Sequence, residues 1–452
     1  MKISLIMCPL WNVDQPPLSI AYIAGQLESV GYDVFCHDFS IDLIHTLPSD
    51  DRQTITQKYL VEGWYTNFDF WRKKLSIDTL VDGWADEVLR NSPKLVGFSI
   101  YDSTLSVSIL LAEAIKKKAP ETSIVFGGPS CDKKEIILRG PIDFLVYGEG
   151  EETITDLAER IENQRAFHDC PGIVFREDGN IVQTPPRPLI GDINTIPFPD
   201  FNGFNLFSYP SKALPMFTSR GCPNRCSFCS ESPRWGRYRF RTAENIVMEM
   251  VRDMETYGIK HFSMEDSTIN GKMDQFEKMC DLVLLKKLEV TWGGKARIDL
   301  RMSPDLLRKA YRAGCRGFIF GIESASQKVL DHMKKNVHIS DVETVILNSY
   351  QAGIQVGCFF IIGYVNETET DFQETLEFIR KNHKYIHTIY QGNGLYILSG
   401  SRLHDRAEEY GIILPEFSPD GEWCTKDGIN TKHIRTDRLK RFNNLVNELY
   451  HR

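Results

Sequence analysis

The sequence lacks any apolar run close to the roughly 20 residues that a membrane-spanning helix needs. Its first residues, MKISLIMCPLW, do not follow the plan of a signal peptide, because polar and acidic residues come directly after them. Basic side chains are not clustered either, since the longest basic run is 116–118 and the formal net charge is −8. These absences argue against a membrane span, a secretory leader and a nucleic-acid footprint.

The cysteines also lack the pattern of a disulfide framework, because eleven of them are scattered through a long chain. An odd, dispersed set is typical of a reducing compartment and predicts the cytoplasm. With 452 residues, 42% of them hydrophobic and 25% charged, the chain has room for two or three ordinary domains.

Residues 1–165 alternate short apolar runs with stretches of helical spacing. The expected strands are 2–8, 32–38, 95–100, 123–128 and 143–152, with a helix at 105–118. This alternation predicts a doubly wound (Rossmann-like) parallel α/β sheet. Residues 45–92 carry three tryptophans and many charges, and they predict an inserted helical excursion.

Ligands of such sheets bind at the carboxyl ends of the strands. The glycines found there either permit close approach to a ligand or only make tight turns, and the pattern alone leaves both interpretations open. The residues at these ends are Cys8, Pro9, Leu10, Trp11, Asn12, Asp102, Ser103, Thr104, Gly127, Gly128, Pro129, Gly148, Glu149 and Gly150.

A segment rich in Pro, Asp and Asn at 166–213 predicts an interdomain linker. Strands and helices alternate again over 214–400, in six units that predict an open, partial (β/α)6 barrel. Functional residues of such barrels lie at the carboxyl ends of the strands. Residues 401–452 predict a helical extension.

Three cysteines, Cys222, Cys226 and Cys229, lie in the loop after the first of these strands with the spacing C-x3-C-x2-C. A structural zinc site normally has four protein ligands, so zinc would need a distant fourth residue. Three thiolates are instead suited to three irons of a four-iron cluster, which leaves one iron open.

This motif, with Phe228 before the last cysteine, resembles the signature of the radical S-adenosylmethionine (SAM) enzymes. The resemblance implies a 4Fe-4S cluster whose open iron binds SAM. It also implies SAM contacts at strand ends, with Arg297 suited to the methionine carboxylate. The implied SAM-binding set is Phe228, Glu265, Asp266, Arg297, Glu323, Ser324, Ile362 and Leu398. After the fifth strand this chain reads GYVNET where relatives usually carry Gly-x-Pro-Gly-Glu-Thr.

The N-terminal order PPLSIAYIAGQLESVGYDV, VGFSI, IVFGGPS and DFLVYGEGEET resembles the cobalamin-binding domain fused to many radical SAM enzymes. The strand-end residues given above would then contact cobalamin. The chain lacks the Asp-x-His-x-x-Gly loop that ligates cobalt in other cobalamin proteins, since His37 precedes Asp38. The resemblance therefore implies cobalamin without a histidine lower ligand.

Together the two resemblances imply a cobalamin-dependent radical SAM enzyme of the class B methyltransferase type. It would methylate an unactivated carbon or phosphorus centre by way of a 5′-deoxyadenosyl radical and methylcobalamin. A radical SAM oxidase, cyclase or rearrangement enzyme with the same cofactors stays open, as does a non-enzymatic cobalamin or iron–sulfur sensor. Methylthio transfer would need an N-terminal domain with three further cluster cysteines. It is disfavoured, because only Cys8 and Cys36 precede Cys131. The expected partners are a small-molecule or peptide substrate and an electron donor such as flavodoxin or ferredoxin. No catalytic side chain is assigned.

Overall fold

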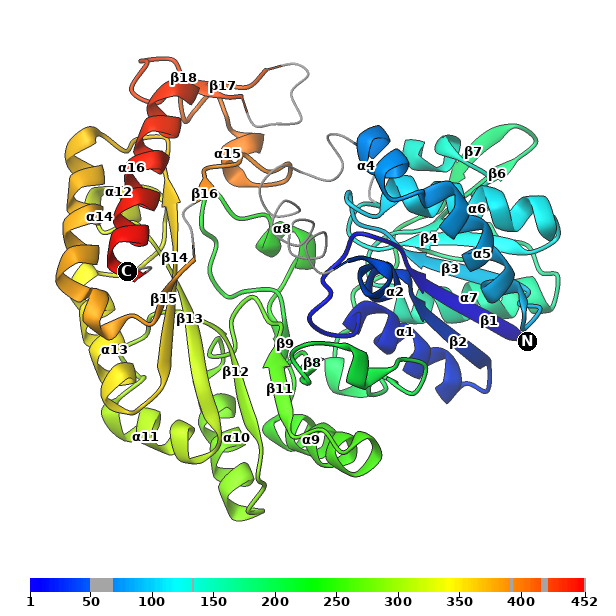
Figure 1. The fold of residues 1–452 in the computed structure, drawn as a ribbon, viewed down its shortest axis with the longest axis horizontal. Helices are drawn as coiled ribbons and strands as arrows, with labels where there is room; N and C mark the ends of the chain where they lie inside the picture. Colours follow the sequence, from blue (N-terminus) through cyan, green and yellow to red (C-terminus); the bar gives the residue numbers. More distant parts are fainter. Residues whose placement is uncertain (49–67, 132–133, 391–392, 416–421, 451–452) are drawn as a thin grey trace. The chain divides into compact units, whose positions relative to one another are not determined.

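The computed structural model of the protein describes residues 1–48, 68–131, 134–390, 393–415 and 422–450. The chain divides into two compact units, Met1–Pro215 and Met216–Arg452. Each unit is an α/β structure built on its own largely parallel sheet (Figure 1). Within the described residues, no helix has both the length and the apolar character that crossing a membrane requires.

The first unit confirms the expected doubly wound fold. Its sheet has the strand order β2-β1-β3-β4-β5-β6-β7, with β1 to β5 parallel and β6 and β7 antiparallel. The strands are β1 (Lys2–Met7), β2 (Asp33–Asp38), β3 (Leu95–Ser99), β4 (Ser123–Gly127), β5 (Phe144–Val146), β6 (Ile173–Glu177) and β7 (Asn180–Gln183). The order reverses between β1 and β3, so their carboxyl ends form the topological switch point where ligands of such sheets bind.

Helices cover both faces of this sheet (Figure 1). They are α1 (Leu18–Ser29), α2 (Phe39–Thr46), α4 (Phe68–Lys74), α5 (Ile77–Leu89), α6 (Leu105–Lys118) and α7 (Glu151–Glu162), with short 3-10 turns η2 (Lys134–Arg139), η3 (Ile193–Thr195) and η4 (Leu206–Ser208). Helix α5 packs against α6, and α1 packs against α7. The buried side chains of α5, α6 and the central strands form one continuous apolar core.

The expected helical excursion at 45–92 is in part a regular crossover. Helix α5 connects β2 to β3, as a doubly wound sheet requires. Trp71 and Trp84 are each only 7% exposed, because they pack into the apolar core of this unit. Residues 49–67, which include Trp64, lie outside the described residues.

The segment 166–213, expected to be a linker, is a structured part of the first unit. Strand β6 pairs with β5 and β7 pairs with β6, so the segment adds a hairpin to the edge of the sheet. Asp178 and Gly179 have φ values of 49° and 79°, as a two-residue hairpin turn requires. Further along, Tyr209 is buried and donates a 2.8 Å hydrogen bond to Asp38 Oδ2.

The second unit contains the parallel sheet expected for a partial six-stranded barrel. Its order is β15-β14-β13-β12-β11-β8, and β16 also pairs with β14. The strands are β8 (Leu214–Met216), β11 (His261–Met264), β12 (Thr291–Ala296), β13 (Cys315–Glu323), β14 (Gln355–Ile362), β15 (Thr388–Ile389) and β16 (Asn393–Gly394).

Helices lie along the outer side of this curved sheet (Figure 1). They are α9 (Ala243–Tyr257), α10 (Met273–Leu285), α11 (Pro304–Arg312), α12 (Gln327–His332), α13 (Ile339–Gln351) and α14 (Glu369–Asn382), with the 3-10 turn η5 (His383–Tyr385). The smaller elements are the ribbon β9 (Ser219–Arg220) with β10 (Arg239–Phe240), α8 (Glu231–Trp235), α15 (Arg402–Asp405), and the ribbon β17 (Ile412–Ile413) with β18 (Cys424–Thr425). The final helix, α16 (Lys432–Tyr450), lies in the segment 401–452 expected to be a helical extension.

Candidate active site

The three cysteines of the C-x3-C-x2-C motif lie on one loop between β9 and α8. All three thiols are free and partly buried. Ser227 anchors the middle of this loop: its N–H donates to Met333 O at 2.9 Å, and its carbonyl accepts from Leu403 N at 2.9 Å. Its hydroxyl also lies 2.6 Å from the hydroxyl of Tyr364. The loop is therefore held by three separate segments of the second unit.

Asp266 fixes the chain that leads into this loop. Its carboxylate accepts hydrogen bonds from Thr218 N at 3.0 Å, from Thr218 Oγ1 at 2.9 Å and from Ser219 Oγ at 2.6 Å. Burial raises the pKa of Asp266 to about 6, against the effect of these hydrogen bonds. The carboxylate of this predicted SAM contact is thus occupied by Thr218 and Ser219, because a carboxylate that is 1% exposed needs such partners.

A buried ion pair lies beside the cysteine loop. Lys335 Nζ is 2.8 Å from Glu323 Oε1, and the two side chains are 14% and 10% exposed. Glu323 has a φ of 70°, a left-handed conformation that is uncommon for a residue with a side chain. A side chain at Gly321 would come within 2.4 Å of Glu323 Oε1, so glycine makes room for the pair.

The cation of this pair acts on all three thiols. Burial raises the pKa of Cys222, Cys226 and Cys229, and the Lys335 ammonium works against that rise at each of them. The Glu323 carboxylate adds to the rise in the pKa of Cys226. Burial prevails at each cysteine, so its pKa stays above the ordinary value, and Lys335 reduces the cost of forming the thiolate that ligates metal.

Sequence reasoning missed Lys335, because a lysine between helices in a polar stretch gives no signal that it is buried. Burial acts to lower its pKa, but Glu323 and the nearby thiols outweigh this effect and hold the pKa above its ordinary value. The ammonium also lies 5.9 Å from the centre of the Phe228 ring, within the range of a cation–π contact. Phe228 itself packs against an apolar cluster that includes Met333 and Tyr364.

Arg297 combines a fixed backbone with an unsatisfied side chain. Its N–H donates to Asn270 Oδ1 and its carbonyl accepts from Asn270 Nδ2, both at 2.9 Å. Within the described residues, its Nε is buried and has no hydrogen-bond partner. The guanidinium acts to lower the pKa of Cys222, which places its charge near the cysteine loop. A buried donor without a partner is suited to an anionic ligand.

The other predicted SAM residues stay a prediction, and the structure shows their local surroundings. Glu265 accepts from Ser263 Oγ at 2.7 Å and lies 3.9 Å from Lys295 Nζ. Ser324 is fully buried and accepts from Ser326 N at 3.1 Å. Ile362 is also fully buried, whereas Leu398 is 49% exposed. The structure therefore supports Phe228, Arg297 and Glu323 as neighbours of the cysteine loop.

In the first unit, the predicted cobalamin contacts lie in the loops that follow β1, β3, β4 and β5. The rings of Trp11 and Tyr101 stack with their centres 3.5 Å apart, which joins the loops after β1 and β3 at the switch point. Trp11 is among the predicted cobalamin contacts, and Tyr101 directly precedes the predicted contact Asp102. Cys8 is fully buried, and burial raises its pKa to about 12, so its thiol faces the core.

Two glycines at this edge differ in what surrounds them. Gly128 has a φ of 118°, and a side chain there would come within 2.8 Å of Ile100 O, so close backbone packing requires glycine. At Gly148, with a φ of 81°, an added side chain would meet nothing within 4 Å. Glu149 is anchored by Ile190 N, which donates to its Oε2 at 2.8 Å. Space at this edge therefore lies beside Gly148.

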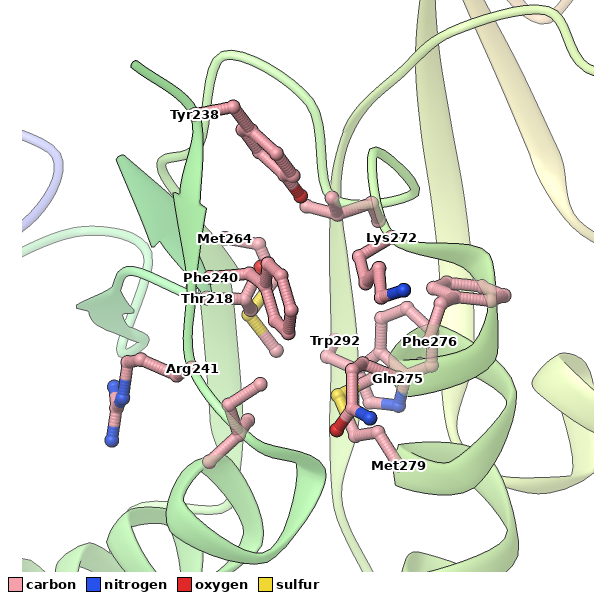
Figure 2. Close-up of a pocket in the computed structure, with 12 residues that line it drawn as sticks. Thr218, Tyr238, Phe240, Arg241, Met264, Lys272, Gln275, Phe276, Met279 and Trp292 are labelled. Atoms are coloured by element: carbon pink, nitrogen blue, oxygen red, sulfur yellow. The ribbon is translucent and has the colours of Figure 1, made fainter. Parts of the chain in front are cut away.

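A small cavity lies elsewhere in the second unit, between the β9–β10 ribbon and helix α10 (Figure 2). Its volume of about 20 Å³ is enough for a water molecule. Its walls are mainly apolar, with Tyr238, Phe276 and Trp292 among them, and Lys272 adds one charge. A side chain at Gly271 would overlap the Tyr238 hydroxyl at 2.5 Å, so the cavity rim is tightly packed.

Among the described residues, no group of three or more His, Cys, Asp or Glu side chains has an arrangement that could hold a single metal ion.

Comparison with known proteins agrees with this arrangement. Residues 216–379 match the radical SAM superfamily, and residues 73–158 match the B12 binding domain. An uncharacterized methyltransferase of Pyrococcus horikoshii is 27% identical over 318 residues, which cover 67% of this chain and 69% of that protein. The anaerobic magnesium-protoporphyrin IX monomethyl ester cyclase of a Synechocystis strain is 25% identical over 372 residues, 80% of this chain and 67% of the cyclase.

The radical SAM methyltransferase TsrM from Kitasatospora setae, solved with cobalamin and a [4Fe-4S] cluster, has a similar fold. Its TM-score is 0.71 at 15% identity, over 100% of this chain and 88% of TsrM. The two sheets, the cysteine loop and both family matches lead to one conclusion. The chain resembles the cobalamin-dependent radical SAM enzymes, including methyltransferases among them.

Proposed function

We propose that this protein uses a 4Fe-4S cluster, SAM and cobalamin to transfer a methyl group to an unactivated carbon or phosphorus centre. The observation that carries the proposal is the anchored loop with three free thiols beside the Lys335 cation and the unsatisfied Arg297 Nε. These features lie in the unit that matches the radical SAM superfamily, and the other unit contains the B12 binding domain. The donor set fits a cluster with an anionic ligand next to it.

Cys222, Cys226 and Cys229 would hold the cluster, one thiolate for each of three irons. A bound cluster supplies one electron to SAM and a bound corrin carries the methyl group, so the cofactors provide the difficult chemistry. The protein's residues bind and orient. Ser227 keeps the loop in place, and Lys335 balances the negative charge that three thiolates bring into a partly buried site.

Arg297 would bind the methionine carboxylate of SAM through its guanidinium. Phe228 would supply an apolar wall beside the cluster. Glu323, besides its expected contact with SAM, would position Lys335. Its carboxylate is held by Lys335, and it orients that cation before any ligand arrives.

Cobalamin would bind at the carboxyl edge of the first sheet, beside Gly148 and the Trp11–Tyr101 stack. The chain lacks the Asp-x-His-x-x-Gly loop whose histidine would bind cobalt. We therefore propose that no protein imidazole binds cobalt.

A second candidate function is cyclisation or oxidation with the same cofactors and without methyl transfer. The similarity to the magnesium-protoporphyrin ester cyclase favours it. In either case we propose a small molecule or a peptide as substrate and a flavodoxin or ferredoxin as electron donor. We expect a reducing cytoplasm, because all eleven cysteines are free.

The deciding experiment uses anaerobically reconstituted protein, methyl-labelled SAM, a reductant and candidate substrates. Label in the product together with 5′-deoxyadenosine supports methyl transfer. Deoxyadenosine with an unlabelled, altered product supports the second candidate. The absence of SAM cleavage with every substrate would contradict both.

A further inference from the structure

The loop after β14 lacks the residues that usually fix the backbone conformation of such a loop. It reads Gly363-Tyr364-Val365-Asn366-Glu367, where relatives usually carry proline and glycine at the third and fourth positions. Proline fixes backbone φ, and glycine adopts strained turns freely, so this loop lacks both devices. Other contacts must hold its conformation.

Asn430 provides these contacts from the turn that precedes α16. Its Nδ2 donates to three carbonyl oxygens of the loop, those of Tyr364 at 2.8 Å, Val365 at 3.3 Å and Glu367 at 3.1 Å. Asn430 is fully buried. Its own backbone is fixed in turn, because its N–H donates to Thr425 Oγ1 and its carbonyl accepts from Thr425 N, both at 3.0 Å.

Two arginines of α16 also hold the loop 363–367. Arg438 Nη1 donates to Glu367 O at 2.9 Å and to Asn430 Oδ1 at 3.1 Å. The stem of Arg435 fills the space beside Gly363, where a side chain would come within 2.3 Å of Arg435 Cγ. The guanidinium of Arg435 also lies 3.7 Å from the centre of the Trp423 ring. Gly363 and Glu367 close the loop internally through a 2.8 Å bond from Gly363 N to Glu367 Oε2.

The same loop reaches the cysteine motif. Tyr364 is fully buried, and its hydroxyl lies 2.6 Å from the hydroxyl of Ser227, between Cys226 and Phe228. Tyr364 and Trp423 also belong to the apolar cluster against which Phe228 packs. Contacts therefore run continuously from the C-terminal segment to the cysteine loop.

We propose that Asn430, supported by Arg438, is a positioning residue of the SAM site: it fixes the loop 363–367 and, through Tyr364, the cysteine loop. This inference rests on the proposed function for the identity of the ligand. The physical reason is that three carbonyls tied to one buried amide lose little freedom when a ligand binds, since the loop is already ordered. The part of the chain after 401 would thus support the binding site without contacting SAM itself.

The test compares Asn430→Ala with Asn447→Ala, a matched control at an exposed position of α16. The first measurement is hydrogen–deuterium exchange of residues 363–367 in the full chain without cofactors. We expect at least tenfold faster exchange in Asn430→Ala and no change in Asn447→Ala. The second is SAM affinity of the reconstituted proteins, for which we expect about a tenfold loss in Asn430→Ala with the cluster absorbance retained.

A third variant, Asn430→Asp, keeps the size of the side chain but removes the Nδ2 donor, and it should behave like Asn430→Ala. Wild-type exchange rates in Asn430→Ala would overturn the proposal. Faster exchange with unchanged SAM affinity would overturn it too, because the loop would then not serve SAM. A wild-type protein that binds no SAM would instead contradict the proposed function, whatever the exchange rates show.

Discussion

Lys335 Nζ and Glu323 Oε1 lie 2.8 Å apart in a partly buried site next to three thiols. Removing one partner of such a pair leaves the other charge buried without compensation, at a cost of about 3–5 kcal/mol in the free energy of unfolding. Lys335→Met should therefore destabilise the second unit by about that amount, as measured by urea denaturation of the full chain. The double variant Lys335→Met, Glu323→Gln should recover most of the loss. Equal stabilities of the wild type and Lys335→Met would contradict this account of the pair.

The three cysteines are expected to act together. Reconstituted protein should hold about four irons, and the triple variant Cys222→Ala, Cys226→Ala, Cys229→Ala should lose the cluster absorbance and SAM cleavage. A matched control is Cys280→Ala, a buried cysteine on α10 away from the loop, which should keep the iron content. A triple variant that still cleaves SAM would end the assignment.

Arg297→Ala should keep the cluster and weaken SAM binding. Losing one charge-assisted contact costs about 1.5–3 kcal/mol, or roughly ten- to hundredfold in affinity. The control is Arg301→Ala on the same loop, because Arg301 is 64% exposed and pairs only locally with Asp299. SAM affinity can be measured by equilibrium dialysis under anaerobic conditions. Equal SAM affinities of Arg297→Ala and Arg301→Ala would show that Arg297 does not bind the methionine carboxylate of SAM.

Cobalamin bound to the first unit should show no nitrogen ligand from the protein. The dimethylbenzimidazole tail of cobalamin should be displaced from cobalt as well. The electron paramagnetic resonance spectrum of the cobalt(II) form should therefore lack superhyperfine splitting from an axial nitrogen. Such splitting in the wild type that disappears in His37→Ala would show that His37 binds cobalt. Protein that takes up no cobalamin would contradict the methyltransferase proposal and leave a radical SAM enzyme without it.

The buried Asp38 should impose a pH dependence on the first unit. Burial raises its pKa to about 7, against the effect of hydrogen bonds from Tyr209 and the start of α2. Because the folded pKa is raised, the folded state binds the proton more tightly than the unfolded chain does. The contribution of Asp38 to the free energy of unfolding is then highest below about pH 4. It falls as the pH rises to about 7, by at most about 4 kcal/mol.

Asp38→Asn keeps the cap and the shape but cannot ionise, so its stability should change less over this range. Urea denaturation at pH 4, 5, 6 and 7 measures how the free energy of unfolding changes with pH in the wild type and in Asp38→Asn. Parallel profiles for Asp38→Asn and the wild type would show that Asp38 does not lose its proton in the folded protein.

The strands could be predicted from the sequence because buried parallel strands leave apolar runs, and helix α6 has the bounds expected for it, 105–118. The hairpin of β6 and β7 was missed, because a short edge ribbon among prolines resembles a linker. At the site, the motif predicted the cysteines, and the resemblance to radical SAM enzymes predicted Arg297. The roles of Lys335, Asn430 and Asp266 depend on partners that are distant in the sequence. Local sequence patterns do not indicate such pairings.

The anchoring of Ser227 bears on how the cofactor is loaded. A disordered cysteine loop would have to lose its conformational entropy when iron arrives, and that loss weakens metal binding. Here Met333, Leu403 and Tyr364 hold the loop through hydrogen bonds that involve no metal. Folding therefore orders the loop before assembly begins. The apoprotein should keep a ready template, so that removal of iron by a chelator can be reversed without refolding the chain.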